Sequence, residues 1–210
     1  RSEGHINDDW VAREESAAAT KELQIIIRVA LSEASIMPNI GKQYVKNIAK
    51  QAANQGIHLE WTTPSGFKVS HEYLPKIMRR SVTWLYNVQS NAYFQEHDLC
   101  EIDARRAEQS IPPNFIHSLD AAHMILCLKK LIEWGIESFS MIHDSYGVAA
   151  PDVNLMRTAI KETFYDIHKC NQLERLRNDV EQQLGTCLPE TPEVGDLDIE
   201  LVLESDYLFC

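Results

Sequence analysis

A His-Asp-Ser triplet is the part of this sequence whose residue types and spacing point most directly to chemistry. An apolar run over residues 136–142 predicts a buried strand, and His143 and Asp144 follow it directly. A second predicted strand leaves with Tyr146, so Asp144 would lie at the tip of a tight hairpin. Mg²⁺ prefers such rigidly aimed carboxylates, and two ions so held can activate a hydroxyl and stabilise a leaving pyrophosphate. The alternative is an aspartate that hydrogen-bonds within its own turn.

The elements around this triplet predict an α+β fold, with helices around a small antiparallel sheet. Apolar periodicity predicts helices over residues 9–35, 42–54, 114–134 and 155–184. A helical pattern also returns at Ile102, and Pro112 and Pro113 are expected to interrupt it and to start the next helix. Alternation and turn residues predict a hairpin over residues 57–69, and a weaker β pattern over 76–101 is expected to turn within residues 87–91.

Charge is distributed unevenly along the 210 residues, whose net charge is −11. Residues 1–100 hold 11 basic and 11 acidic side chains, whereas residues 101–210 hold 9 basic and 20 acidic ones. Because phosphate contacts dominate nucleic-acid affinity, this balance by itself disfavours free-standing DNA or RNA binding. It fits a chain that supplies metal-binding carboxylates while another polypeptide supplies a basic channel.

Cysteine spacing and apolar runs restrict the class of protein further. The five cysteines include no Cys-x-x-Cys pair, which disfavours both a disulfide framework and a structural zinc site. No apolar run has the length of a membrane-spanning helix, and the first ten residues lack a signal-peptide block. We therefore expect a cytoplasmic protein.

Four blocks of the sequence, in this order, resemble the single-subunit RNA polymerases of phages and mitochondria. Residues 61–67, Trp-Thr-Thr-Pro-Ser-Gly-Phe, resemble the Trp-x-Thr-Pro-x-Gly hairpin of that family. Residues 111–123 resemble the helix that precedes its third polymerase motif, and residues 136–147 resemble that motif itself. Ser145, which follows the aspartate, is typical of RNA rather than DNA synthesis. Residues 204–210 resemble the short aromatic foot at the family's carboxyl terminus.

The resemblance implies roles for single residues of the third motif and the helix before it. Asp144 matches the metal-binding aspartate, which would hold two Mg²⁺ ions between the growing end and the incoming nucleotide. His143 would place Asp144 or the primer terminus, with packing in the turn as the alternative. His117 matches a histidine that contacts the minor groove of the newest base pair, where acceptor atoms recur for every pair. The alternative for His117 is a histidine on a partly buried helix face beside Asp120.

Residues 79–95 lie where the family places its specificity loop, a hairpin that enters the major groove of the promoter. Four side chains there are suitable readers of DNA bases or phosphates: Arg79, Arg80, Gln89 and Asn91. Trp84 and Tyr86 in the same segment are expected to pack rather than to stack on bases. Three further residues would lie in the active-site neighbourhood: Tyr146, Phe209 and Cys210. Cys210 departs from the family's usual small terminal residue.

Two parts of the family's active site have no counterpart in this sequence: the first motif, with the other catalytic aspartate, and the second, whose lysine and arginine grip the nucleotide and whose tyrosine selects ribose. The resemblance implies part of a right-hand polymerase. It would contain a helical fingers-side segment over residues 1–56, β-hairpins over 57–101 and a carboxyl-terminal palm part over 102–210.

We therefore expect a DNA-directed RNA polymerase component, a nucleotidyltransferase, that is inactive alone. Its partners would be a DNA template, the RNA product, ribonucleoside triphosphates and the polypeptide with the missing motifs. One subunit of a split bacteriophage enzyme, a heterodimer in the host cytoplasm, is the expectation, and a piece of a longer protein is the alternative. A contrasting hypothesis is a non-catalytic binding or scaffold module in a transcription complex. A stand-alone metal hydrolase is disfavoured, because the sequence lacks a second cluster of ligands.

Overall fold

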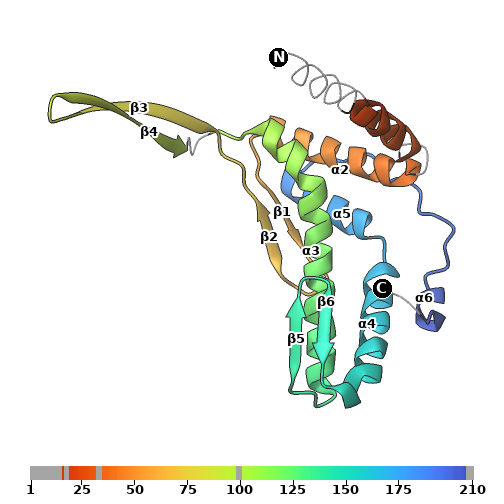
Figure 1. The fold of residues 1–210 in the computed structure, drawn as a ribbon. Coiled ribbons are helices and arrows are strands. Elements are labelled where there is room, and N and C mark those ends of the chain that lie inside the picture. Colours follow the sequence, from red (N-terminus) through yellow and green to blue (C-terminus); the bar gives the residue numbers. More distant parts are fainter. Residues whose placement is uncertain (1–15, 17–18, 32–34, 98–100, 207–210) are drawn as a thin grey trace, which may run out of the picture. The chain divides into compact units, whose positions relative to one another are not determined.

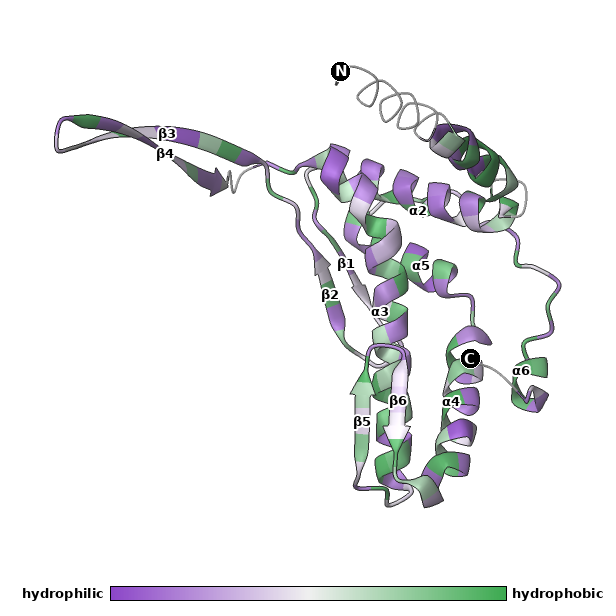
Figure 2. Cartoon of the chain, in the orientation of Figure 1, coloured by the Kyte–Doolittle hydropathy of each residue, from purple (hydrophilic) through white to green (hydrophobic). Residues whose placement is uncertain are grey.

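The computed structural model describes residue 16 and residues 19–31, 35–97 and 101–206. The chain divides into two units, Arg1–Lys42 and Gln43–Cys210. The first unit contains the helix Ala19–Leu31, which lies within the helix predicted over residues 9–35. Apolar residues recur along this helix (Figure 2), and six of them are about half exposed or more: Leu23, Ile25, Ile26, Ile27, Val29 and Leu31. No single helix among the described residues is long and apolar enough to cross a membrane, although Ala19–Leu31 and Ile36–Asn54 meet that test together as a bent pair.

Helix α2 comprises Ile36–Asn54, so the predicted start at residue 42 is wrong. Pro38 lies in the first turn, where the backbone amides have no partner within the helix, and it therefore does not interrupt the helix. Gly41 is tolerated at a cost of about 1 kcal/mol relative to alanine. The buried face of α2 lies in the second unit and comprises Tyr44, Val45, Ile48, Ala49 and Ala52.

The first hairpin pairs strands β1 (Leu59–Thr62) and β2 (Lys68–His71) in an antiparallel register, as the sequence predicts. Its turn is closed by the Thr63 amide, which donates to the Phe67 carbonyl at 2.9 Å. The Thr63 hydroxyl accepts from the Phe67 amide at 3.1 Å. Gly66 has a φ of +87°, a conformation that favours glycine.

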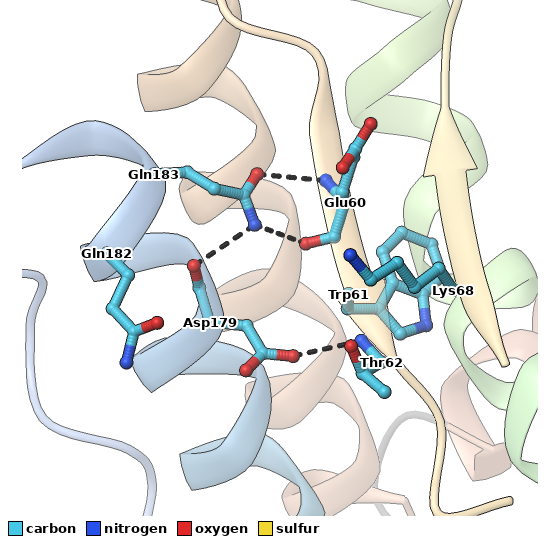
Figure 3. A pocket seen from close by; sticks show the side chains of 7 residues that line it. All are labelled: Glu60, Trp61, Thr62, Lys68, Asp179, Gln182 and Gln183. Carbon is cyan, nitrogen blue, oxygen red and sulfur yellow. Dashed lines mark hydrogen bonds between the residues drawn. The ribbon is translucent and has the colours of Figure 1, made fainter. Parts of the chain in front are cut away.

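Side chains of helix α5 (Gln172–Leu184) cover the free edge of β1 (Figure 3). The Gln183 side chain accepts from the Glu60 amide at 3.0 Å and donates to the Glu60 carbonyl, as a neighbouring strand would. Asp179 accepts from the Thr62 amide at 2.9 Å. An unpaired strand edge is a template for association with other chains, and these contacts remove it.

The second hairpin pairs β3 (Lys76–Leu85) with β4 (Val88–His97), and within the described residues these two strands form a sheet of their own (Figure 1). The β structure predicted over residues 76–101 is confirmed within the described residues. The turn lies earlier than predicted, at Tyr86 and Asn87, whose φ angles are +48° and +63°. Two consecutive positive φ angles suit a two-residue hairpin turn, because the twist of that turn matches the twist of the strands.

Helix α3 is a single helix, Ala104–Glu133, so the predicted interruption is wrong. Pro112 and Pro113 lie inside it, where a proline removes a backbone hydrogen bond. The Asp103 carboxylate caps the amino end by accepting from the Arg106 amide at 3.0 Å. Buried residues on both sides of the prolines keep the helix continuous: Ala107, Ile111, Phe115 and Leu119.

The third hairpin pairs β5 (Phe139–Ile142) with β6 (Ser145–Val148), and the predicted hairpin is confirmed. Its two-residue turn consists of His143 and Asp144, one residue before the turn predicted at Asp144 and Ser145. The prediction that β5 is a buried strand is wrong, because only Met141 packs against the second core while Phe139, Ser140 and Ile142 are exposed. The short helix η1 (Ala150–Asp152) and helix α4 (Val153–His168) follow.

Helices α4 and α5 correct the single helix predicted over residues 155–184. Asn171 separates them and caps α5, since its side-chain oxygen accepts from the amides of Leu173 at 3.1 Å and Glu174 at 3.3 Å. Helix α6 (Leu201–Glu204) is the last element. The predicted α+β class is confirmed, and its antiparallel pairing occurs in three separate two-stranded sheets among the described residues.

Two cores hold the second unit together. The first joins α2, β1, α5 and the amino-terminal half of α3 around Trp61, Ile111 and Val180. The second joins the carboxyl-terminal half of α3 to α4 and to the β5–β6 hairpin around Cys127 and Leu131. The hairpin that carries the His-Asp-Ser triplet is therefore supported on two helices.

Candidate active site

The β5–β6 hairpin and helix α3 line one cleft of about 850 Å³. The helix contributes His117, Asp120, Ala121 and Met124, and the hairpin contributes Met141, Ile142, His143 and Asp144. Three predicted site residues, which are distant in sequence, thus lie at one cleft. The hairpin places Asp144 there because the two-residue turn is closed by pairing of Ile142 with Ser145.

Asp144 is exposed, and its carboxylate forms no hydrogen bond or ion pair with the other described residues. The alternative in which this aspartate bonds its own turn is thereby disfavoured. A free carboxylate on a short turn can accept a hard cation without first giving up another partner.

The two predicted histidines of the cleft are both exposed. His143 has a φ of +53°, which is costly for a residue other than glycine, and such strain is concentrated at functional sites. Its exposure disfavours the alternative in which it packs in the turn. The His117 side chain is exposed although Ser118 and Leu119 beside it are buried, so the alternative of a histidine on a partly buried helix face is disfavoured too.

Tyr146 is half-buried behind the turn, and its hydroxyl lies 3.1 Å from Nδ1 of His123. Nε2 of the same histidine lies 3.0 Å from the Ile160 carbonyl in α4. Burial is the main cause that raises the pKa of Tyr146 to about 12, so the phenol keeps its proton at neutral pH. The sequence analysis did not assign a role to His123. A signal was present, because His123 lies four residues from both Leu119 and Cys127 on an apolar helix face, where a histidine needs a buried polar partner.

The carboxylates available at the cleft fit part of a magnesium site. Asp144 and Asp120 both line it and offer the oxygen ligands that Mg²⁺ prefers. No group of three histidine, cysteine, aspartate or glutamate residues in the described part of the chain is placed to hold a metal ion. The remaining ligands of an ion at Asp144 would therefore come from water, substrate phosphates or residues outside this sequence.

Three of the four predicted DNA-reading residues of the β3–β4 hairpin already have partners within it, namely Arg79, Arg80 and Asn91. The Arg79 guanidinium forms an ion pair with Glu96. Arg80 donates from two nitrogens to the side-chain oxygen of Asn91, at 3.0 Å and 2.8 Å. Gln89 is exposed and lies directly across the hairpin from Trp84.

The aromatic side chains of this hairpin correct one expectation. Trp84 is 68% exposed and Tyr86 is 96% exposed, so neither packs against the rest of the described chain as predicted. Their rings are therefore accessible to a partner. The two remaining predicted site residues, Phe209 and Cys210, lie outside the described residues.

Comparison with known proteins shows the family. The model of the family described as DNA-dependent RNA polymerase matches residues 9–189. The chain is 34% identical over 163 residues to T7 RNA polymerase from Escherichia phage T7, covering 72% of this chain and 18% of that protein. It is 30% identical over 210 residues to the mitochondrial DNA-directed RNA polymerase 1 of Arabidopsis thaliana, covering all of this chain and 20% of that protein.

A shorter relative is matched along most of its length. The DNA-directed RNA polymerase 1A sequence of Nicotiana tabacum is 33% identical over 152 residues, which cover 72% of this chain and 94% of that sequence. The chain spans about a fifth of the length of the phage and Arabidopsis relatives. The match over residues 9–189 includes the cleft with its His-Asp-Ser turn, and the chain belongs to the family of DNA-dependent RNA polymerases.

Proposed function

We propose that this chain is the part of a DNA-directed RNA polymerase that supplies one metal-binding aspartate, Asp144, to a two-metal active site. The observation that carries the proposal is the exposed carboxylate, without a partner among the described residues, at the tip of β5–β6 in a cleft shared with His117. Family membership supports template-directed nucleotidyl transfer as the reaction. Bound Mg²⁺ would activate the attacking hydroxyl and stabilise the leaving pyrophosphate.

The chain's own residues would then orient the reacting ends. The turn would hold the Asp144 carboxylate in the cleft. The unfavourable φ angle of His143 persists only because the paired strands impose it, so the hairpin would set the direction of the carboxylate. His117 lines the other side of the cleft and can donate to the minor-groove acceptors that all base pairs share. Such a donor checks the geometry of a pair without reading its sequence.

The rest of the active site would lie outside this sequence. A two-metal site needs carboxylates from more than one segment, and the chain spans about a fifth of its phage and Arabidopsis relatives. The exposed apolar residues of Ala19–Leu31 support a contact with further protein, since apolar patches of this kind mark interaction sites. We propose that the missing motifs belong to a second subunit or to the remainder of a longer chain in the cytoplasm.

The contacts with nucleic acid would be divided between two places. The cleft would take the growing RNA end and the incoming ribonucleoside triphosphate. The β3–β4 hairpin, with exposed Trp84, Tyr86 and Gln89, would contact the DNA template. In this scheme residues 1–56 belong to the fingers side, 57–101 form the hairpins, and 102–210 belong to the palm.

The test is template-directed nucleotide incorporation by this chain alone and by its stable complex purified from the source. We expect no incorporation by the chain alone and incorporation by the complex. The other component of the complex should carry the first motif, with its aspartate, and the second motif, with its lysine, arginine and tyrosine. If the purified protein is one longer polypeptide, the same motifs should lie in its remainder. A complex without these motifs, or one that binds DNA without incorporating nucleotides, would instead indicate a non-catalytic module.

A further inference from the structure

One neutral tautomer of the buried His123 imidazole satisfies the contacts of its nitrogens with Ile160 and Tyr146. Nε2 lies 3.0 Å from the Ile160 carbonyl, which can only accept a hydrogen bond, so Nε2 must carry the proton. In a neutral ring Nδ1 is then the acceptor, and the Tyr146 hydroxyl at 3.1 Å is the donor. A fixed chain of two hydrogen bonds thus runs from helix α4 through α3 to strand β6.

Tyr146 connects this chain of hydrogen bonds to the turn that carries Asp144. Tyr146 pairs with Met141 across the hairpin, and the next pair, Ile142 with Ser145, closes the turn. Asp144 is therefore only two residues from the side chain that His123 holds. A change in the direction of the Tyr146 side chain would tilt the short hairpin and move the carboxylate within the cleft.

Among the described residues, the core contacts of this hairpin come from a small number of its side chains. Phe139 is 38% exposed and Ile142 is 65% exposed, so half of β5 contributes little to the core. Three half-buried residues pack it against the second core: Met141, Tyr146 and Val148. Because apolar packing alone is not directional, the hydroxyl of Tyr146 adds an orientation that the packing does not provide.

The surroundings of His123 keep its ring neutral and immobile. Its ring centroid lies 5.8 Å from that of Tyr146 and 5.7 Å from that of Phe164, both edge-on. Burial lowers the pKa of His123 and outweighs the hydrogen bond to the Ile160 carbonyl and the charge of Asp120 on α3, both of which raise it. His168 on α4 is the other titratable group coupled to this imidazole. A neutral imidazole retains the acceptor that the Tyr146 hydroxyl needs.

We infer that His123 is a positioning residue, which aims Asp144 by holding the Tyr146 hydroxyl from its Nδ1 atom. The inference rests on the proposed role of Asp144. His123 does not line the cleft and would not touch the substrate, so it acts on the reaction only through the hairpin. A small displacement of the Asp144 carboxylate would lower the rate, because catalysis depends on the exact placement of the reacting groups.

The test compares two tyrosine variants of the complete polymerase that contains this chain. Tyr146→Phe removes the hydroxyl and keeps the ring, and we expect kcat to fall about fivefold, as for the loss of one hydrogen bond, with an unchanged KM for the nucleotide. Tyr44→Phe is the matched control, because the Tyr44 hydroxyl donates to the Pro189 carbonyl at 3.0 Å in the first core. This control should leave kcat unchanged, whereas a general effect of lost stability would lower kcat in both variants.

A second comparison separates the hydrogen bond from the packing of the imidazole. We expect His123→Ala to lower kcat and to make the rate insensitive to a further Tyr146→Phe change, since the two residues act as one unit. Nitrogen NMR of the histidine ring should show Nε2 protonated and Nδ1 unprotonated, and this readout requires no activity.

The outcomes distinguish the inference from the proposed function. An unchanged kcat in Tyr146→Phe, losses that multiply in the double variant, or the opposite tautomer would overturn the positioning role. If Asp144→Ala also leaves incorporation unchanged, the proposed function fails together with it. If only Asp144→Ala abolishes incorporation, the function stands and the positioning role is wrong.

Discussion

The hairpins β1–β2 and β5–β6 are both held by a buried histidine, yet they leave different groups exposed. Nε2 of His71 on β2 lies 2.9 Å from the Ala107 carbonyl oxygen, and Nδ1 lies 3.3 Å from the side-chain nitrogen Nδ2 of Asn114. His123 lies between the Ile160 carbonyl and the Tyr146 hydroxyl in the same manner. In each case a helix carbonyl fixes the tautomer and a second polar side chain completes the link.

The first hairpin buries three side chains fully, Leu59, Trp61 and His71, whereas no residue of β5 or β6 is fully buried. Leu59 and Trp61 are each 3% exposed, and the turn of β1–β2 is closed by its own hydrogen bonds. The turn of β5–β6 consists of the exposed His143 and Asp144. The comparison indicates that β1–β2 stabilises the fold, and it fits the proposal that β5–β6 gives up burial in order to aim the Asp144 carboxylate. Regions that serve binding are often drawn from the less stable parts of a structure.

The largest effect that can test this contrast is on stability. Trp61→Ala should lower the free energy of unfolding by about 3–5 kcal/mol, because it empties a buried site. It also removes the indole donor to the Ser118 hydroxyl at 3.0 Å. Ile142→Ala in the second hairpin, at a side chain 65% exposed, should cost about 0.5 kcal/mol or less. Urea denaturation measures both, and similar losses for the two variants would contradict the division of roles.

A smaller effect is expected from pH. Burial lowers the pKa of His71, His123 and His168, so below about pH 6.5 the unfolded chain binds protons that the folded chain does not. The free energy of unfolding should therefore fall as the pH drops from about 6.5 toward the folded-state pKa values, by up to about 1.4 kcal/mol per pH unit for each histidine.

Denaturation at pH 7.5 and 5.5 checks this dependence, and substitution sharpens the comparison of the two hairpins. His71→Asn should make the dependence shallower by removing one of the three groups. Glu181 does not interfere with this measurement. Its pKa is lowered chiefly by the hydrogen bond from the Leu188 amide, so its contribution to the free energy of unfolding is lost only when the pH falls below the pKa of a glutamate in the unfolded chain. A free energy of unfolding that is equal at the two pH values would show that these imidazoles are not held neutral in the fold.

The smallest effect concerns strain in the second hairpin. His143 has a φ of +53°, and replacement by glycine should raise the free energy of unfolding by about 1 kcal/mol. Asn87→Gly, at a φ of +63° in the β3–β4 turn, is the matched control, because asparagine tolerates this conformation and the gain should be smaller. If the His143 side chain helps to place Asp144, His143→Gly should raise the free energy of unfolding and lower the rate of nucleotide incorporation by the complete polymerase. A gain in stability with no loss of rate would assign His143 to the turn alone.

Local patterns predicted the hairpins well, because strand alternation and turn residues are close in sequence. The β5–β6 turn was placed within one residue of its observed position. The interruption of α3 was predicted wrongly, since Pro112 and Pro113 have a strong local preference against a helix interior. Burial of Ile111 and Phe115 on either side of them overrides that preference, and such burial depends on distant segments.

Other features depended on contacts that sequence spacing does not report. The cleft joins His117 to Asp144 through the packing of a hairpin on a helix, which the family resemblance implied and the local pattern did not. The link from His123 to Tyr146 and Ile160 connects three elements and was missed. By contrast, Asn171 followed by Glu174 is a local cap signal that would have separated α4 from α5.

A cysteine substitution at Asp144 tests most directly whether this residue is a metal ligand of a polymerase. In the complete polymerase, Asp144→Cys should lower the rate of nucleotide incorporation in Mg²⁺ about 10³-fold, because a thiolate is a poor ligand for a hard cation. Mn²⁺ should restore part of the rate, since it accepts softer ligands more readily. Glu137→Cys, at an exposed carboxylate just before β5, should change neither rate. A rate in Mg²⁺ that is unchanged by Asp144→Cys would contradict the account.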